Sequence, residues 1–389
     1  MSSPVHSPSA QYIVIGAGLT GSAAAWKLAQ RGYEVALLER KVPAAADASS
    51  HGSARIFRYA YPDPFYADLV VQARSAWDEL ELLSGQQLIT PHGAVDYGAL
   101  RNPRQLASVL EQVGVEHELL SATEARNRFP GIEFDTEVLW QPGAGVLDAQ
   151  RSVLAMVNQA KANGAQVETE WQVASVTEQG NGYKLTSTDG RVYFGAKIIV
   201  AAGGWLPELL GNLPLPEGFL RSVPSLDIYQ ENAYHFPYRG QDPEAMMAWP
   251  TYIHKDPAFK SYGLPGGRDA GFRGQKVAEY MAGRRMGSAS EQDGQIDPTN
   301  RERVIDYVKK YLPGLEPAPY AETTCIFSST PTEDFIMDQV EGITIISPCS
   351  GHGAKFGPLL GTLAADLSTG TGTVPQAFRL TSHNRALSV

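Results

Sequence analysis

Apolar and polar positions follow different periods in different parts of the chain. A continuous apolar run at 12–15 leads into a glycine-rich turn, and small or apolar residues then recur at helical spacing up to Gly32. A continuous apolar run suits a strand buried on both faces, whereas the 3.6-residue period indicates a helix. We therefore predict a strand, a helix and a second strand that ends at Glu39, which together form a βαβ unit.

The same periods predict further elements downstream. Helical spacing recurs at 104–115, 151–167 and 302–314, and apolar alternation at 226–238 predicts a strand of an antiparallel sheet. Short alternating segments with glycine-containing turns over 173–201 predict a β-meander that ends in an apolar strand. Together, the βαβ unit, the meander and the antiparallel strand predict an α/β protein with a separate α+β region.

The turn "VIGAGLTGS" has the spacing of a dinucleotide site. Gly16 allows a tight turn, Gly18 lets backbone approach a pyrophosphate, and Gly21 lets the helix pack closely on the strand. Glu39 ends the second strand, where a carboxylate accepts hydrogen bonds from ribose hydroxyls. The carboxylate disfavours a 2′-phosphate, so FAD and NAD both remain possible cofactors. The meander that starts at Val173 is typical of flavoproteins and favours FAD, which makes Val173 a candidate cofactor contact.

Composition narrows the classes of protein. The chain has 389 residues, of which 43% are hydrophobic, which is enough for two domains. Its net charge of -10 repels phosphate backbones, so we expect no nucleic acid partner. No apolar run is long enough to cross a bilayer, and we expect residues 1–10 to form a disordered tail rather than a secretory signal.

Cysteine usage indicates the compartment. Cys325 and Cys349 are the only cysteines, too few for a disulfide framework, so we expect a reducing, cytoplasmic location. Neither histidine nor cysteine has metal-site spacing, and we expect no metal.

Three further blocks carry a family resemblance. They are "SSHGSARIFRYAYPDPFYADLVVQARSAWDELE", "CIFSSTPTEDFIMD" and "CSGHGAKFGPLLG". With the glycine turn, they resemble the monomeric sarcosine oxidase and N-methyltryptophan oxidase family of FAD-dependent amine oxidases. The likeness is looser from about Gln86 to Pro142 and from Pro224 to Ala289.

The resemblance implies a Rossmann-like FAD-binding domain with an inserted α+β substrate domain that carries an antiparallel sheet. We expect 11–85, 143–222 and 320–389 to form the first domain. We expect 86–142 and 223–319 to form the second.

Cys325 occupies the position at which this family attaches FAD through a thioether. Thiolates attack electrophilic carbon, so one placed thiol suffices for the bond. The alternative is an inert buried cysteine, which is our interpretation of Cys349.

The segment "CSGHGAKF" predicts a helix start whose backbone donors, at Gly351 and Gly353, stabilise negative charge on a reduced flavin. By resemblance, the Lys355 ammonium reaches the carboxylate of the substrate. The alternative is a solvated lysine.

Two arginines lie three residues apart in "SARIFRYAY". By resemblance, Arg58 grips the substrate carboxylate, Arg55 lies beneath the flavin, and His51 belongs to the preceding loop. The alternative is a surface pair of arginines. Ser53 and Ala54 replace the family's usual Asp-Thr.

A fourth block, "KSYGLPGGRDAGFRGQKVAEYMAG", resembles the part of the family that handles oxygen. Tyr262 matches a tyrosine beside the substrate, and Lys276 matches the lysine that activates O₂, a role for which Arg273 is the alternative. Tyr280 stands where the family has histidine, which favours a substrate other than sarcosine.

The resemblance implies a monomer that oxidises a small secondary amine bearing a carboxylate, namely sarcosine or an N-methyl or cyclic amino acid. The products are an imine and, from O₂, hydrogen peroxide. Three alternatives stay open: an FAD amine dehydrogenase with another acceptor, an enzyme like D-amino acid or glycine oxidase, and a non-catalytic FAD-binding subunit.

Overall fold

A computed structural model describes residues 8–240 and 249–386. The first seven residues of the predicted tail lie outside this part. The prediction is wrong for Ser9 and Ala10, because strand β1 (Ser9–Ile15) already begins there and pairs with Phe194 and Gly195. No described helix has both the length and the apolar character needed to cross a membrane.

The first sheet has eight strands and contains the predicted βαβ unit. In its centre β1 lies parallel to its neighbours β2 and β12, and β9 and β20 extend the parallel part on either side. The meander and β19 complete it with antiparallel pairs. The bounds are β2 (Val35–Leu38), β9 (Gln166–Glu168), β10 (Val173–Gln179), β11 (Gly182–Ser187), β12 (Val192–Val200), β19 (Ile336–Val340) and β20 (Ile343–Ser347).

Helices cover this sheet on both faces, as parallel strands require. On one face α1 (Leu19–Gln30) packs between α5 (Ala149–Ala162) and α10 (Gly357–Thr369), with α2 (Pro64–Ser84) outside them. The approach of α10 is close, since a Cβ at Gly361 would lie 2.3 Å from that of Ala23. The remaining helices of this part are α6 (Leu206–Leu210), α7 (Glu217–Ser222) and α11 (Leu380–Ala386).

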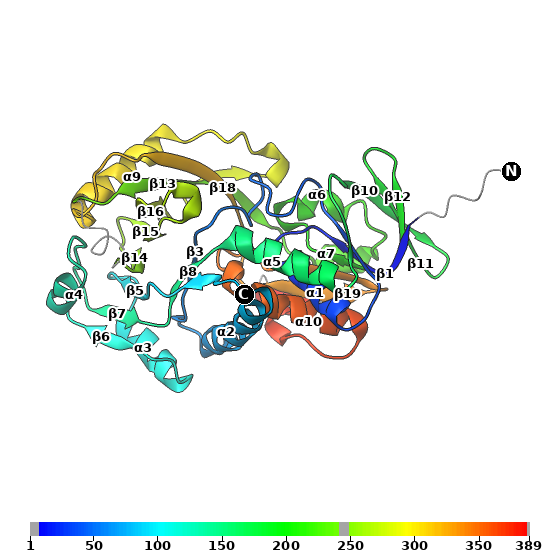
Figure 1. The fold of residues 1–389 in the computed structure, drawn as a ribbon, viewed down its shortest axis with the longest axis horizontal. Coiled ribbons are helices and arrows are strands. Elements are labelled where there is room, and N and C mark those ends of the chain that lie inside the picture. The colour runs from blue at the N-terminus through cyan, green and yellow to red at the C-terminus, as the bar shows by residue number, and fades with distance from the viewer. Residues whose placement is uncertain (1–7, 241–248, 387–389) are drawn as a thin grey trace.

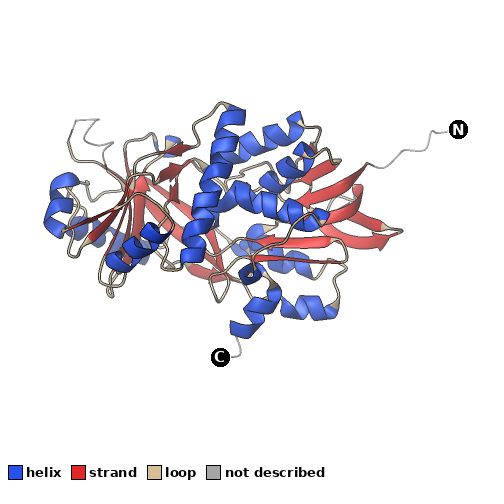
Figure 2. Ribbon diagram, turned by 90° about the horizontal axis from the view of Figure 1, so that it is seen from below, coloured by secondary structure: helices blue, strands red, loops and turns tan. Residues whose placement is uncertain are grey.

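The second sheet has nine strands, and Figure 2 shows the strands of the two sheets toward opposite ends of the molecule with helices between them. Its neighbouring strands are antiparallel, as expected, except that β5 and β14 are parallel. The bounds are β5 (Ala94–Tyr97), β6 (Glu118–Leu120), β7 (Val138–Gln141), β13 (Asp227–Pro237), β14 (Thr251–Lys255), β15 (Lys260–Pro265), β16 (Gly274–Glu279), β17 (Arg284–Met286) and β18 (Ala321–Ser329).

Shorter elements connect these layers. Helices α3 (Pro103–Gln112) and α4 (Ala122–Arg128) lie near β6, and α9 (Pro298–Tyr311) packs on β13 and β16. A small sheet joins β3 (Arg55–Phe57), β8 (Gly145–Leu147) and β4 (Ile89–Thr90). Short 3₁₀ turns span Gly203–Trp205, Arg268–Ala270, Ala289–Glu291, Gly353–Phe356 and Gln376–Phe378.

The predicted helices exist, but each ends before its predicted range does, α3 at Gln112 and α9 at Tyr311, and the difference is largest in the third. The helix predicted over 151–167 ends at Ala162, because Gly164 turns the chain with φ +92°. Its last residues instead form β9, which is parallel to β2. The three residues of β9, Gln-Val-Glu, contain one apolar side chain, too few for the pattern to distinguish a strand from the end of a helix.

Sheet membership bears on the proposed domains. Strand β18, with Cys325 at its centre, pairs with β13 from Asp227↔Ser329 to His235↔Ala321, so it belongs to the second sheet. The expected boundary at 320 therefore lies too early in the chain. We propose a two-domain division in which this boundary falls at the end of β18.

Candidate functional site

A cavity of about 880 Å³ lies where the two sheets meet. One part of its wall comes from the glycine turn after β1, the end of β12 and the segment after β20. Another part comes from β15, β16 and β18 of the second sheet. A ligand in it therefore contacts both sheets.

The glycine turn is shaped for backbone to line the cavity. Gly16 has φ +97°, and a Cβ there would lie 2.5 Å from the Ala201 carbonyl oxygen, so no other residue fits. The carboxylate of Glu39 accepts hydrogen bonds from the backbone N–H of Ala17 at 2.7 Å and of Lys41 at 2.9 Å. Glu39 thereby fixes the turn from the next strand while it lines the cavity.

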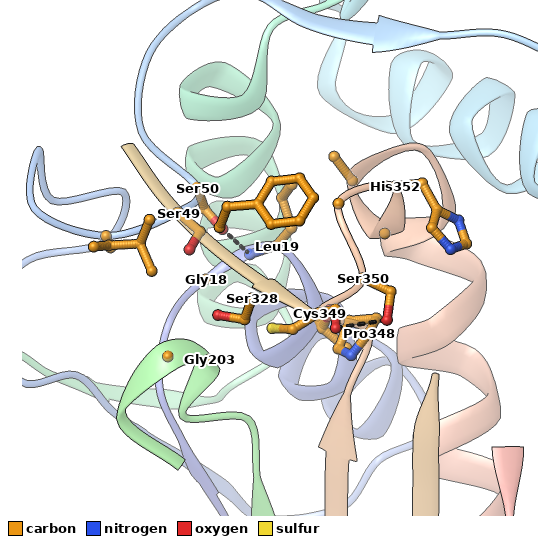
Figure 3. A pocket seen from close by; sticks show the side chains of 18 of the residues that line it. Gly18, Leu19, Ser49, Ser50, Gly203, Ser328, Pro348, Cys349, Ser350 and His352 are labelled. Atoms are coloured by element: carbon orange, nitrogen blue, oxygen red, sulfur yellow. Dashed lines mark hydrogen bonds between the residues drawn. The ribbon is translucent and has the colours of Figure 1, made fainter. Parts of the chain in front are cut away.

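A second backbone loop borders the same cavity. Figure 3 shows the glycine turn, with Leu19 donating to Ser50 Oγ at 3.0 Å, and the loop that starts at Pro348. In that loop Gly351 has φ +71°, and a Cβ there would lie 2.0 Å from the Phe327 ring. Gly353 also lines the cavity, but it begins a 3₁₀ turn, so helix α10 starts later than predicted, at Gly357.

Several cationic side chains line the cavity, and four of those that the sequence singled out form no ion pair with a carboxylate of the described chain. They are Arg55, Arg58, Lys276 and Lys355. Both lysines are almost fully buried, with exposed fractions of 7% and 4%. A buried cation without a partner is costly, so this cavity favours an anionic or electron-rich ligand.

Arg58 and Lys355 meet at one tyrosine. The Lys355 ammonium donates to the Tyr61 hydroxyl at 2.9 Å and to the His352 carbonyl at 2.8 Å. The Arg58 guanidinium lies 4.8 Å from the centre of the Tyr61 ring and donates to the Ala60 carbonyl. Burial, and then the charge of Arg58, hold the pKa of Lys355 well below its usual range.

Lys276 lies elsewhere on the wall, on β16 between β13 and β15. Burial, and then the charge of Arg55, lower the pKa of its ammonium to about 8. The alternative cation, Arg273, is exposed and lies with its guanidinium 4.6 Å from the centre of the Tyr320 ring. The structure thus brings Lys276, and not Arg273, to the cavity.

The other predicted residues of the second sheet reach the same wall. Cys325 on β18 has a free thiol, and Tyr262 on β15 has a pKa raised by burial and by the nearby Cys325. The Tyr280 hydroxyl donates to Glu333 at 3.4 Å, and its ring packs edge to face on Phe327. Val173 lines the cavity as well.

His51 is the predicted site residue that the structure does not bring to the cavity wall. Its backbone carbonyl accepts from Arg55 at 2.8 Å, so it fixes that arginine instead. Burial lowers the pKa of its imidazole to about 4, which keeps the ring neutral.

The structure explains why Ser53 can stand where the family usually has aspartate. The Ser53 hydroxyl donates to the carboxylate of Asp269, and the backbone N–H of Asp269 donates back to Ser53 Oγ at 3.1 Å. Asp269 lies in the turn between β15 and β16. This turn thus docks on the segment that carries Arg55.

Several lining residues escaped the sequence analysis, among them Tyr61, Arg101 and Lys255. Tyr61 stood inside the quoted block next to Arg58, and only its contact with Lys355, 294 positions away, reveals its importance. Cys349, interpreted as inert, also lines the cavity, and burial raises the pKa of its thiol.

A buried polar network holds the segment of Arg58. The Asp96 carboxylate accepts from Arg101 at 2.6 Å and from the Gln141 amide at 2.7 Å. The Gln141 carbonyl accepts in turn from the backbone N–H groups of Tyr59 and Ala60, at 2.9 and 2.8 Å. Strands β5 and β7 thereby fix the chain on which Arg58 and Tyr61 lie.

Comparisons with known proteins agree with this geometry. Residues 11–367 match the family model described as FAD dependent oxidoreductase. The chain is 31% identical over 382 residues to monomeric sarcosine oxidase from Streptomyces avermitilis, covering 95% of this chain and 96% of that one. It is 28% identical over 368 residues to N-methyl-L-tryptophan oxidase from Yersinia pestis, covering 91% and 93%.

Solved structures share the fold. The open form of NikD, an unusual amino acid oxidase essential for nikkomycin biosynthesis, superposes with a TM-score of 0.81 at 22% identity, covering 95% of this chain and 96% of that one. L-Proline dehydrogenase from P. horikoshii superposes with a TM-score of 0.82 at 17% identity, covering 98% and 99%.

The buried network makes a prediction for stability. Asp96→Asn leaves the Arg101 charge without its partner and should lower the free energy of unfolding by about 3–5 kcal/mol. The double variant Asp96→Leu/Arg101→Met removes both charges and should recover most of this loss. Urea unfolding curves measure both; equal losses in the two variants would contradict the interpretation.

Proposed function

Because the chain belongs to the FAD-dependent oxidoreductase family, we propose that it oxidises a small secondary amine bearing a carboxylate to an imine, with O₂ reduced to hydrogen peroxide. Candidate substrates are sarcosine and other N-methyl or cyclic amino acids. The observation that carries the proposal is the pair Arg58 and Lys355, both held at Tyr61 beside the cavity with no carboxylate partner among the described residues.

The cavity suits FAD. Its volume of about 880 Å³ is at the upper end of the usual range for ligand sites, and Gly16, Gly18 and Gly21 of the glycine turn line it without side chains. We assign Gly16, Gly18, Gly21, Glu39 and Val173 to the nucleotide part of the cofactor. Gly351 and Gly353 present backbone toward its electron-accepting part. When bound, FAD supplies the acceptor of two electrons.

Arg58 and Lys355 hold the substrate carboxylate. The arginine offers a planar fork of donors, and the lysine offers a second charge-assisted hydrogen bond. Because burial makes the Lys355 charge costly, a bound carboxylate stabilises its protonated form. The same cations lower the pKa of a nearby substrate amine, which favours the neutral lone pair that oxidation requires.

The remaining groups shape the reaction space. Tyr262 and Tyr280 are held neutral by burial and border the substrate. Arg55 and Lys276 add positive charge, which favours electron transfer into the cavity and stabilises superoxide as O₂ is reduced. The imine product hydrolyses in water, to formaldehyde where an N-methyl group was oxidised.

We further propose that Cys325 attaches the cofactor covalently, and that the protein acts as a monomer in the cytoplasm. The printed name of the Streptomyces relative supports the oligomeric state. Two free thiols in the described chain support a reducing compartment.

An oxidase assay tests the function. Purified protein should form peroxide with N-methyl or cyclic amino acids, and Arg58→Met should lower kcat/KM for them about 10- to 100-fold, the worth of one charge-assisted hydrogen bond. Arg104→Met, an exposed arginine paired with Glu137, is the control. If no such amine bleaches the flavin colour, the proposal is wrong; if the colour bleaches but O₂ restores it slowly, the enzyme is a dehydrogenase.

Cofactor attachment has a matched pair of variants. Acid precipitation of Cys325→Ala should leave the yellow colour in the supernatant, while Cys349→Ala should keep it in the pellet as the unchanged protein does. Both cysteines line the cavity, so the pair separates attachment from general disturbance of the site. Colour lost from the pellet in Cys349→Ala alone would reverse the assignment.

Lys276 should control the oxygen step. Lys276→Met should slow reoxidation of the reduced enzyme about 10²- to 10³-fold, the usual effect of removing one electrostatic stabiliser. In the unchanged protein the rate should fall as the pH rises through about 8, because the ammonium loses its proton there. Stopped-flow absorbance measures both effects. Lys276→Arg keeps the charge, so a fall at pH 8 that persists in this variant would exclude Lys276 as its source.

A further inference from the structure

Three potential metal ligands converge away from the cavity, at the end of β14. His254 is near the end of this strand, Asp256 follows in the turn to β15, and Asp135 lies in the loop before β7. Their ligand atoms all lie within 4.8 Å of one another, although Asp135 and His254 are more than a hundred positions apart in the sequence. This separation explains why residue spacing predicted no metal.

His254 is held in one orientation. Its side chain is fully buried, and its ring stacks on Tyr97 with 4.4 Å between centroids and 11° between planes. A second ring, that of Tyr311, meets it edge on. Nδ1 forms a hydrogen bond with the Tyr307 hydroxyl at 2.9 Å. The other nitrogen, Nε2, therefore has a fixed direction.

That nitrogen is buried and has no hydrogen-bond partner among the residues that the structure describes. It faces Asp135, whose carboxylate oxygen lies 3.9 Å away, which is too far for a hydrogen bond. Nε2 therefore has no hydrogen bond to either carboxylate among the described residues, and the three ligand atoms lie within 4.8 Å of one another.

Lys310 is the nearby cation that could occupy the space between these ligand atoms in place of a metal ion. It is exposed, and its ammonium lies 4.6 Å from the centre of the Tyr311 ring. Within the described chain it forms no ion pair with Asp135 or Asp256. Lys310 therefore leaves the space between the ligand atoms free.

We propose that Asp135, His254 and Asp256 bind a divalent transition-metal ion of the Zn²⁺ class. One imidazole with two carboxylates suits zinc better than Ca²⁺ or Mg²⁺, which prefer oxygen alone. Bonds of about 2.1 Å in a tetrahedron place ligand atoms roughly 3.4 Å apart, so the carboxylates need to close in by about 1 Å. Asp135 is exposed and free to do so, while Tyr307 holds the buried histidine as an outer-shell partner does.

The bound ion would join the loop at Asp135 to the turn at Asp256. Lys255, next to His254, lines the cavity, so the ion would fasten one edge of the cavity wall. This inference does not depend on the proposed function.

Zn²⁺ binding to the chelator-treated holoenzyme tests the site. Titration calorimetry should show one Zn²⁺ per chain with a dissociation constant in the micromolar range or below. Asp135→Asn and Asp256→Asn should each weaken binding at least 10-fold and remove the Zn²⁺-dependent rise in Tm. In Asp256→Asn the side-chain oxygen that accepts from Ala258 remains, so the fold of the turn is kept.

Asp68→Asn, an exposed carboxylate on α2, is the control and should bind Zn²⁺ as the unchanged protein does. The two aspartates keep the test independent of His254, whose replacement could unfold the sheet. An anomalous-scattering peak at the zinc edge between the three side chains would support the site. Absence of binding at 1 mM Zn²⁺, or binding that neither aspartate variant weakens, would overturn it.

Discussion

Positive charge gathered at one cavity, without an ion-pairing carboxylate among the described residues, is the constraint on which the site depends. Arg55, Arg58, Lys276 and Lys355 all reach one cavity, and the fold supplies none of them with a carboxylate from the described chain. Such an arrangement costs stability, and it persists because backbone carbonyls and the Tyr61 ring partly solvate the charges. The part of the desolvation cost that these contacts do not offset is relieved when a ligand with negative charge, or one that accepts electrons, binds.

The two sheets divide the work of building this cavity. The parallel sheet presents backbone through its glycine turn, which suits a nucleotide that many proteins recognise in the same way. The second sheet presents side chains from β15, β16 and β18. Identities of 28–31% across nearly the whole chain leave room for differences in the side chains that line the cavity.

The sequence predicted the parts of the fold that depend on neighbouring residues. The βαβ unit, the meander and α9 follow from local period, and the Gly16 turn follows from its spacing. Long-range strand pairing could not be predicted from local patterns. Strand β18 pairs with β13 across about ninety intervening residues, and β9 lies within a range that was predicted to be helical. The same limit hid Tyr61 and Arg101, whose partners come from distant strands, and placed His51 at a wall that it does not reach. The resemblance pointed to residues that line the cavity, such as Arg55 and Lys355, but only the structure shows that Ser53 and Asp269 join the Arg55 segment to the turn between β15 and β16.

The position of β18 has a mechanical consequence. The glycine turn belongs to one sheet and Cys325 to the other, so a molecule that fills the cavity touches both halves of the protein. Its binding energy opposes separation of the halves and couples their unfolding. The cofactor then holds the two sheets together in addition to taking part in the reaction. Without it, the two halves of the protein would be less firmly attached to each other.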